Sequence, residues 1–158
     1  MTKLHEESLR VRIIAVADSW LGTPYHPMGR VKGVGVDCLT LLAEVYAEAG
    51  LIAPLEVPYY PHDWHLHRAA ERYLEGLSRY THEVQLPLAG DIVPFRFGRC
   101  FSHGAIVIEW PRIIHAYVGR ACMIENVQTA TWLMRRGEQG SQADYLRERR
   151  FFSLFAPA

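Results

Sequence analysis

An apolar run with helical spacing follows the dipeptide Asp37-Cys38 and ends at Gly50. Before it lies a loop rich in glycine and proline, residues 22–35, which is unsuited to regular structure. Asp is a favoured N-cap residue and Gly is typical just after a helix C-terminus, so we expect a helix that begins at Cys38. Unpaired backbone N–H groups in a first helical turn favour a thiolate over a thiol. Cys38 is therefore a candidate nucleophile.

The rest of the chain divides into a helical first half and a strand-rich second half. Apolar residues at helical spacing predict amphipathic helices over about residues 4–21 and 62–77. After residue 84, short segments rich in β-branched and aromatic residues alternate with turn residues. These expected strands are 92–97, 103–110, 112–117, 121–127 and 149–155, and Pro94 places the first at a sheet edge or beside a bulge. The pattern indicates an α+β fold, a single domain over residues 1–158 with N-terminal helices packed on a central antiparallel β-sheet.

Two histidines in the strand-rich half are candidate partners for the Cys38 thiol. His103 opens one expected strand and His115 closes the next. With a turn at Trp110-Pro111, these strands pair as a hairpin whose partner positions sum to roughly 218 or 221, which brings both histidines to one end. A nucleophilic cysteine needs a base and a third group that orients the base. The geometry allows a triad of Cys38, His103 and His115.

Five short motifs occur in order within residues 16–117. They are Trp20-Leu21-Gly22-Thr23-Pro24-Tyr25, Asp37-Cys38, Gly90-Asp91-Ile92-Val93, His103 before a small apolar strand, and His115 further on. In this order they resemble the NlpC-type family of cell-wall cysteine peptidases. The loop 29–35 before Asp37-Cys38 resembles the phage and prophage branch of that family in particular.

The resemblance implies a papain-like NlpC-type fold and a cysteine endopeptidase that hydrolyses stem peptides of bacterial peptidoglycan next to D-Glu and a diamino acid. Cys38 matches the family nucleophile, His103 the general base, and His115 the residue that orients the base. Tyr25 matches a tyrosine that helps the backbone N–H of Cys38 hold the oxyanion, and Asp37 matches a residue that helps to receive the free amine of the substrate. The implied mechanism is thiolate attack, an acyl-enzyme and release by water, without cofactor or metal.

Two positions depart from the pattern of that family. Leu39-Thr40 stands where Ser-Gly is usual, and the larger residue at position 40 is expected to crowd the packing of helix on sheet or to narrow the cleft. Pro94 interrupts the strand after Gly90-Asp91. Neither departure removes a catalytic group, so both bear on substrate range more than on chemistry.

The other two cysteines are weaker candidates for a nucleophile. Cys100 lacks a helix N-terminus that would favour a thiolate, and Cys122 alternates in phase with core residues, which indicates a buried structural cysteine. Glu109 and Glu125 also lie in the strand-rich half and leave the third position of the triad open beside His115.

A cluster of three histidines lies in the second expected helix, at His62, His65 and His67. Only the first two share a helix face and no acidic pair completes a ligand set, so a solvated face or a cleft rim is favoured over a zinc site.

Charge and hydropathy narrow the partners that we expect. The formal net charge is +0 at pH 7, which gives no electrostatic reason for binding nucleic acid or an anionic membrane. The first residues lack the apolar core of a signal peptide, and no apolar run approaches membrane-spanning length. We therefore expect synthesis in the cytoplasm and action at the cell wall, through a phage particle or after lysis, with stem peptides and phage tail proteins as partners.

Two other functions stay open at this point. One is a structural or assembly protein of a phage tail tip that keeps the fold and has little or no activity. The other is a thiol acyltransferase acting on lipids, which the lack of a membrane anchor disfavours.

Overall fold

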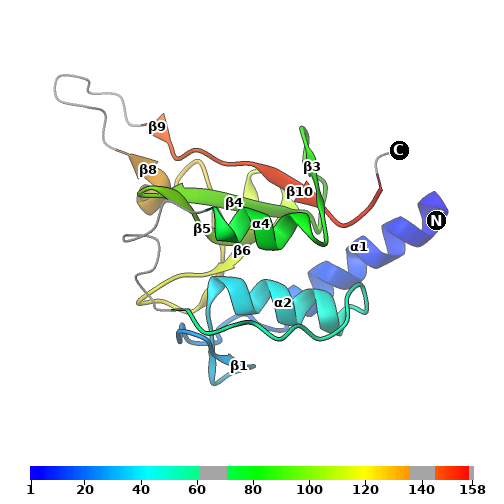
Figure 1. Ribbon diagram of the computed structural model, residues 1–158, viewed down its shortest axis with the longest axis horizontal. Helices are drawn as coiled ribbons and strands as arrows, with labels where there is room; N and C mark the ends of the chain where they lie inside the picture. The colour runs from blue at the N-terminus through cyan, green and yellow to red at the C-terminus, as the bar shows by residue number, and fades with distance from the viewer. Residues whose placement is uncertain (61–70, 136–144, 157–158) are drawn as a thin grey trace.

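The computed structural model describes residues 1–60, 71–135 and 145–156. The helices are α1 (Lys3–Asp18), α2 (Cys38–Glu48) and α4 (Arg72–Ser78), with a short 3₁₀ helix at Thr131–Leu133. The main sheet is antiparallel and has the strand order β3-β10-β4-β5-β6-β7 (Figure 1). Its strands are β3 (His82–Val84), β4 (Ile92–Phe97), β5 (Cys100–Glu109), β6 (Arg112–Ala116), β7 (Cys122–Asn126) and β10 (Phe151–Ser153). Two small sheets pair β1 (Arg30–Val31) with β2 (Gly35–Val36), and β8 (Met134–Arg135) with β9 (Tyr145–Leu146).

The predicted α+β arrangement is confirmed, with differences at its boundaries. The first expected helix is α1, which ends at Asp18, and the five expected strands correspond to β4, β5, β6, β7 and β10. Only the last part of the expected helix 62–77 is seen, as α4, because residues 61–70 and their three histidines lie outside the described residues. The loop 22–35 was expected to be irregular, yet it contains the β1-β2 hairpin. No described helix is both long and apolar enough to cross a membrane.

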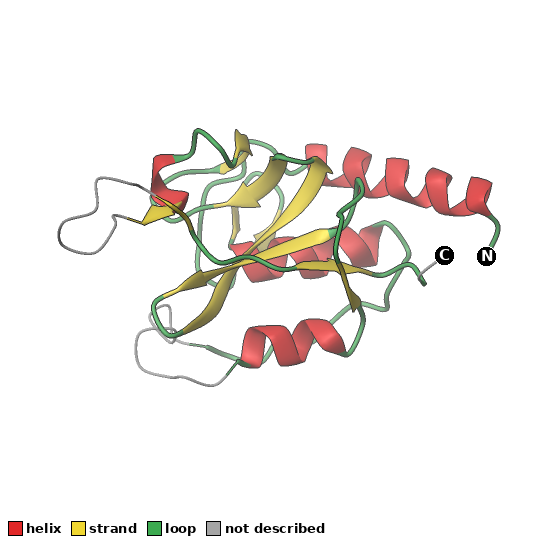
Figure 2. Ribbon diagram, turned by 90° about the horizontal axis from the view of Figure 1, so that it is seen from above, coloured by secondary structure: helices red, strands yellow, loops and turns green. Residues whose placement is uncertain are grey.

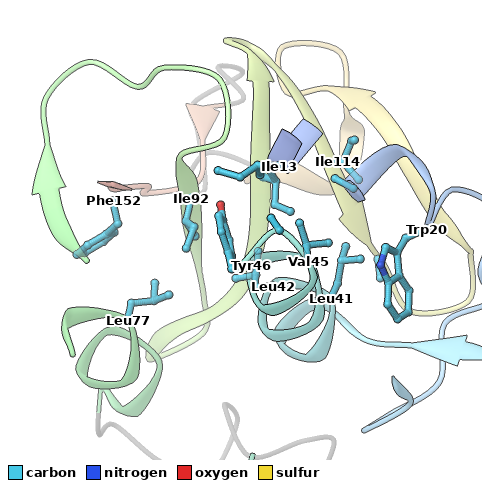
Figure 3. Packing of buried hydrophobic residues seen from close by; sticks show 14 of the residues in the cluster. Ile13, Trp20, Leu41, Leu42, Val45, Tyr46, Leu77, Ile92, Ile114 and Phe152 are labelled. Atoms are coloured by element: carbon cyan, nitrogen blue, oxygen red, sulfur yellow. The ribbon is translucent and has the colours of Figure 1, made fainter. Parts of the chain in front are cut away.

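The central strands bury both of their faces. Ile106 and Ile114 belong to an apolar layer shared with the helices, whereas their neighbours Val107 and Ile113 belong to a second layer on the opposite face. In Figure 2, α2 lies between α1 and α4, and it packs directly on β5 and β6. Figure 3 shows the helical layer, to which α1, α2, α4 and the sheet contribute Ile13, Leu41, Leu42, Val45, Leu77, Ile92, Ile114 and Phe152. Burial of this layer fixes the start of α2 against β5.

Pro94 lies in an interior strand, so the expectation of an edge strand is wrong. Strand β4 sits between β5 and β10. The carbonyl of Pro94 accepts a hydrogen bond from the backbone N–H of Arg150 at 3.3 Å, and this contact does not need the N–H that proline lacks. The alternative expectation, a bulge, is confirmed by a register shift between Phe95 and Arg96.

Gly104 on β5 allows α4 to approach the sheet closely. A Cβ atom at this position would collide with the hydroxyl of Tyr73 and would lie 3.0 Å from Cδ1 of Leu42. We expect Gly104→Ala to lower the free energy of unfolding by about 1–3 kcal/mol, because the overpacked core must shift. Urea denaturation with an unchanged m-value measures this loss. As a control, Gly76→Ala changes an exposed position of α4 where an added Cβ meets no atom within 4 Å, and it should raise stability by about 0.5–1 kcal/mol. Equal effects of the two variants would contradict the close approach.

Candidate active site

Cys38 is the first residue of α2, and a reciprocal cap fixes its position. The carboxylate of Asp37 accepts the backbone N–H groups of Leu39 and Thr40 at 3.0 and 2.9 Å, while the Thr40 hydroxyl accepts the Asp37 N–H at 3.0 Å. The predicted helix start is confirmed. Thr40, the departure from the family pattern, is fully buried and completes this cap. The half-buried Cys38 places Sγ 3.8 Å from the carbonyl oxygen of Ser102 on β5.

The carboxylate of Asp37 is already saturated with hydrogen bonds. Besides the two cap N–H groups, Oδ1 lies 3.0 Å from the Thr40 hydroxyl. Oδ2 accepts the backbone N–H of Met28 at 2.7 Å and the hydroxyl of Tyr60 at 2.5 Å. A carboxylate offers about four lone-pair sites in all, and Asp37 is only 2% exposed. A substrate amine would reach Asp37 only by displacing a protein donor such as Tyr60.

His103 and His115 form a hydrogen-bonded chain that ends on Glu125. Nε2 of His103 is 3.0 Å from Nδ1 of His115, and Nε2 of His115 is 3.0 Å from Oε2 of Glu125 on β7. The predicted proximity of the two histidines is confirmed. The expected hairpin register holds at the turn, where Glu109 pairs with Arg112, and then shifts along the strands.

An aromatic box surrounds this chain. Trp132, from the 3₁₀ helix, stacks on His115 with ring centroids 4.8 Å apart and planes 15° from parallel. Its indole N–H also donates to Oε2 of Glu125 at 2.6 Å. Phe97 stacks on the same indole at 6.0 Å, and Tyr117 lies 5.6 Å from the His103 ring. These contacts hold both imidazoles in place and keep water from most of their surface.

A pocket of about 140 Å³ opens onto Cys38 and His103. Its walls also include Tyr25, Pro27, Asp37, Leu39, Tyr60, Tyr73, Phe97, Ser102, Tyr117 and Val118. The structure therefore brings four of the five predicted site residues to one pocket, and His115 lies directly behind His103. Within the described ranges, no cluster of His, Cys, Asp and Glu side chains could hold a metal ion.

Electrostatics favour uncharged forms of the thiol and both imidazoles. Burial and the Asp37 carboxylate raise the pKa of Cys38 to about 12, although backbone N–H groups, including its own, lower it. Burial and the adjacent His115 hold the pKa of His103 well below its usual value. Burial lowers the pKa of His115 to about 4 despite the opposing effect of Glu125. In the free protein, desolvation therefore opposes the thiolate that the helix N-terminus was expected to favour.

Alkylation of Cys38 in the free protein should follow its raised pKa. We expect the iodoacetamide rate at pH 7–8 to lie below that of free cysteine and to keep rising above pH 10, since only the thiolate reacts. Peptide mass spectrometry reads this site separately from Cys100 and Cys122. In denaturant, the same thiol should titrate near the ordinary pKa of about 8.5. A native rate that levels off below pH 8 would contradict the neutral resting state.

Sequence reasoning left two members of the site unassigned. Glu125 was an open alternative for the third position, and the structure places it fourth, behind His115. Trp132 was not considered, because it lies in the segment 128–147, which has no clear periodicity. No local pattern indicates a tryptophan whose partners are reached only when β7 and the 3₁₀ helix fold back onto β6.

The sequence matches no protein-family model and no curated protein. Solved structures do resemble it. The NlpC/p60 domain of the peptidoglycan hydrolase SagA has a TM-score of 0.52 at 22% identity, over 75% of this chain and 90% of that one. An NlpC/P60 family protein from Bacillus cereus has a TM-score of 0.55 at 22% identity, over 78% of this chain and only 36% of that one. This chain has the NlpC/p60 fold.

The NlpC/p60 fold is found with and without catalysis. RipD from Mycobacterium tuberculosis has a TM-score of 0.54 at 16% identity, over 93% of this chain and 98% of that one. It is described as a non-catalytic NlpC/p60 domain protein adapted to peptidoglycan binding. Catalysis therefore depends on the side chains of the site, since the NlpC/p60 fold alone does not decide it.

Proposed function

We propose that this chain is a cysteine peptidase that hydrolyses peptide bonds of peptidoglycan stem peptides, next to D-Glu and a diamino acid. The observation that carries the proposal is the shared pocket of Cys38 and His103, with His115 hydrogen-bonded behind the base. A nucleophile on a helix N-terminus, a base and an orienting group are the parts that acyl transfer through a thioester requires.

In the proposed hydrolysis, His103 accepts and returns the proton at each step. As Sγ of Cys38 bonds to the scissile carbonyl carbon, its proton passes to His103. The backbone N–H of Cys38 and the hydroxyl of Tyr25 stabilise the oxyanion, and burial raises the pKa of Tyr25, so that it stays a donor. Cleavage of the C–N bond then leaves a thioester, and His103 protonates the departing amine. Water gives a proton to His103 and attacks the thioester, and Cys38 leaves as a thiol by taking that proton back from His103, which frees the carboxylic acid product.

The fold comparison and the motif order together support the proposed substrate. SagA is described as a peptidoglycan hydrolase, and this chain spans most of its NlpC/p60 domain. We also propose that the protein acts at the cell wall as part of a phage tail or prophage system, on the resemblance of its loop 29–35. A stem peptide with a free amine would displace Tyr60 from Asp37 on binding.

A second candidate function is binding without cleavage. The neutral thiol of Cys38 and the non-catalytic RipD favour this alternative, in which the pocket recognises wall peptides or the chain serves in tail assembly. A thiol acyltransferase acting on lipids is a third and weaker candidate.

The experiment is incubation of the purified protein with peptidoglycan sacculi and defined stem peptides, followed by mass spectrometry of the soluble products. Peptidase activity predicts one fragment with a new free amine on the diamino acid and a matching fragment with a new carboxyl group on D-Glu. Co-sedimentation with sacculi without any product would favour the binding function. Turnover of lipid esters without peptide cleavage would favour the acyltransferase.

A further inference from the structure

The hydrogen-bonded chain behind Cys38 is one member longer than a triad. Glu125 lies on β7, and its side chain is 16% exposed, whereas that of His115 is fully buried. Its Oε2 accepts hydrogen bonds from Nε2 of His115 at 3.0 Å and from the indole N–H of Trp132 at 2.6 Å. Arg120 faces the other oxygen, Oε1, at 3.7 Å. Glu125 is therefore held as a charged acceptor behind the two histidines.

The direction of each hydrogen bond follows from this acceptor. A carboxylate only accepts, so the proton of neutral His115 must sit on Nε2, and its Nδ1 is left with a lone pair. Because Nδ1 of His115 then accepts, Nε2 of His103 must donate across their 3.0 Å contact. In neutral His103 this leaves Nδ1 unprotonated. That nitrogen has no hydrogen-bond partner within the described residues and is the only ring atom able to take a proton.

Without Glu125, the opposite arrangement becomes available. A neutral His115 could carry its proton on Nδ1 and donate it to Nε2 of His103. The His103 proton would then sit on Nδ1, and the ring could not accept the proton of a thiol. The two arrangements differ only in where the protons lie, so burial and stacking alone do not select between them.

We propose that Glu125 is a positioning residue that sets the proton positions of His115 and His103, so that Nδ1 of His103 is the base for Cys38. The proposal rests on the proposed cysteine chemistry and deepens it. Trp132 supports the arrangement, because its stacked ring keeps His115 in plane and its N–H holds Oε2 of Glu125. Acting only through the histidines, Glu125 touches no reacting atom.

Proton positions can be measured directly by two-bond ¹H–¹⁵N correlation spectra of protein labelled at histidine, at pH 7. We expect both His103 and His115 to carry their proton on Nε2, with signals assigned by their loss in His103→Gln and His115→Gln. In Glu125→Ala, a substantial fraction of His103 should shift its proton to Nδ1. Glu125→Gln keeps a carbonyl acceptor and should retain most of the original form. Glu109→Gln changes an exposed carboxylate on β5 and serves as the matched control.

The loss of kcat in each variant should follow the fraction of His103 that carries its proton on Nδ1. Glu125→Ala should lower kcat for stem-peptide hydrolysis by about 10- to 100-fold, which is less than the roughly 10⁴-fold loss that the wrong tautomer causes in a Ser-His-Asp triad. Glu125→Gln should lose less than Glu125→Ala. His103 protonated on Nδ1 in the wild type, or unchanged proton positions in Glu125→Ala, would overturn the proposal. If Glu125→Ala does not fold, the same spectra are recorded for Glu125→Asp, whose shorter side chain withdraws the carboxylate from His115, and for Trp132→Phe. A shift of the His103 proton to Nδ1 in Glu125→Asp but not in Trp132→Phe would support the role of the carboxylate.

The spectra separate this proposal from the proposed function. If the proton positions move as expected but the protein cleaves no stem peptide, the positioning role of Glu125 is supported and the proposed substrate is rejected. If Glu125→Ala still cleaves stem peptides and its spectra are unchanged, the positioning role of Glu125 is rejected and the proposed peptidase function stands.

Discussion

Cys38→Ala is expected to lower kcat for stem-peptide hydrolysis by a factor of about 10⁴ or more, because no thioester can form. The substitution removes one half-buried sulfur atom, whose hydrogen bond to the Ser102 carbonyl is long, at 3.8 Å. The fold should therefore survive, and the thermal midpoint should change by only a few degrees. Release of new amino groups from purified stem peptide measures the rate.

The matched control is Cys122→Ala, which removes a buried thiol from β7 that is not among the pocket walls. It should keep the wild-type kcat and lose roughly 1 kcal/mol of stability through the cavity that it leaves. Binding to sacculi should persist in Cys38→Ala, because the other walls of the pocket are unchanged. Equal hydrolysis by wild type and Cys38→Ala would assign the activity to a contaminant and favour the function of binding without cleavage.

The sequence predicts those parts of the site that local signals determine. Asp37 before an apolar helical run and Gly50 after it mark the ends of α2, and both ends are where the residue types require them. A turn at Trp110-Pro111 between two β-rich segments is enough to bring His103 and His115 together. Such features depend on neighbours a few residues away, which is why spacing alone reveals them.

The parts that could not be predicted depend on contacts between distant segments. The pKa of Cys38 follows from burial against β5, which opposes the helix terminus that the sequence does reveal. Tyr60 reaches Asp37 from a connection without regular structure, so its hydrogen bond has no sequence signal. The same holds for Trp132 on Glu125, where an indole and a carboxylate become partners only after the sheet has formed.

Arg10 shows the same limit in the scaffold that positions α2. It lies on α1, whose helical spacing predicts a buried apolar face, yet Arg10 itself is only 9% exposed. Its guanidinium donates to Oδ1 of Asp91 at 2.9 Å and to the carbonyl of Ala89 at 2.8 Å, and it lies 4.3 Å from the centre of the Phe155 ring. Asp91, part of a motif that suggested a family, thus serves to anchor α1 to the start of β4.

Asp91→Ala should cost about 1.5–3 kcal/mol of unfolding free energy, because it removes the buried carboxylate that accepts from the Arg10 guanidinium and leaves it only the more exposed ion pair with Glu6 at 2.8 Å. This loss is a large fraction of the roughly 5–15 kcal/mol that holds a typical domain together. The double variant Arg10→Met/Asp91→Ala should recover part of the loss, since the guanidinium that lost its buried partner is then replaced by an apolar side chain. Urea denaturation of the two single variants and the double variant gives the coupling energy between the two side chains.

The exposed pair of Arg150 and Glu83 provides the control for that cycle. Both side chains are 40% exposed, so solvent screens their attraction, and Glu83→Ala should cost less than about 1 kcal/mol. Asp91→Ala should exceed this by several-fold, because Asp91 is 1% exposed and its second oxygen also accepts the backbone N–H of Leu88 at 2.8 Å. Similar small costs for Asp91→Ala and Glu83→Ala would show that water reaches Arg10 and that apolar packing alone holds α1 on the sheet.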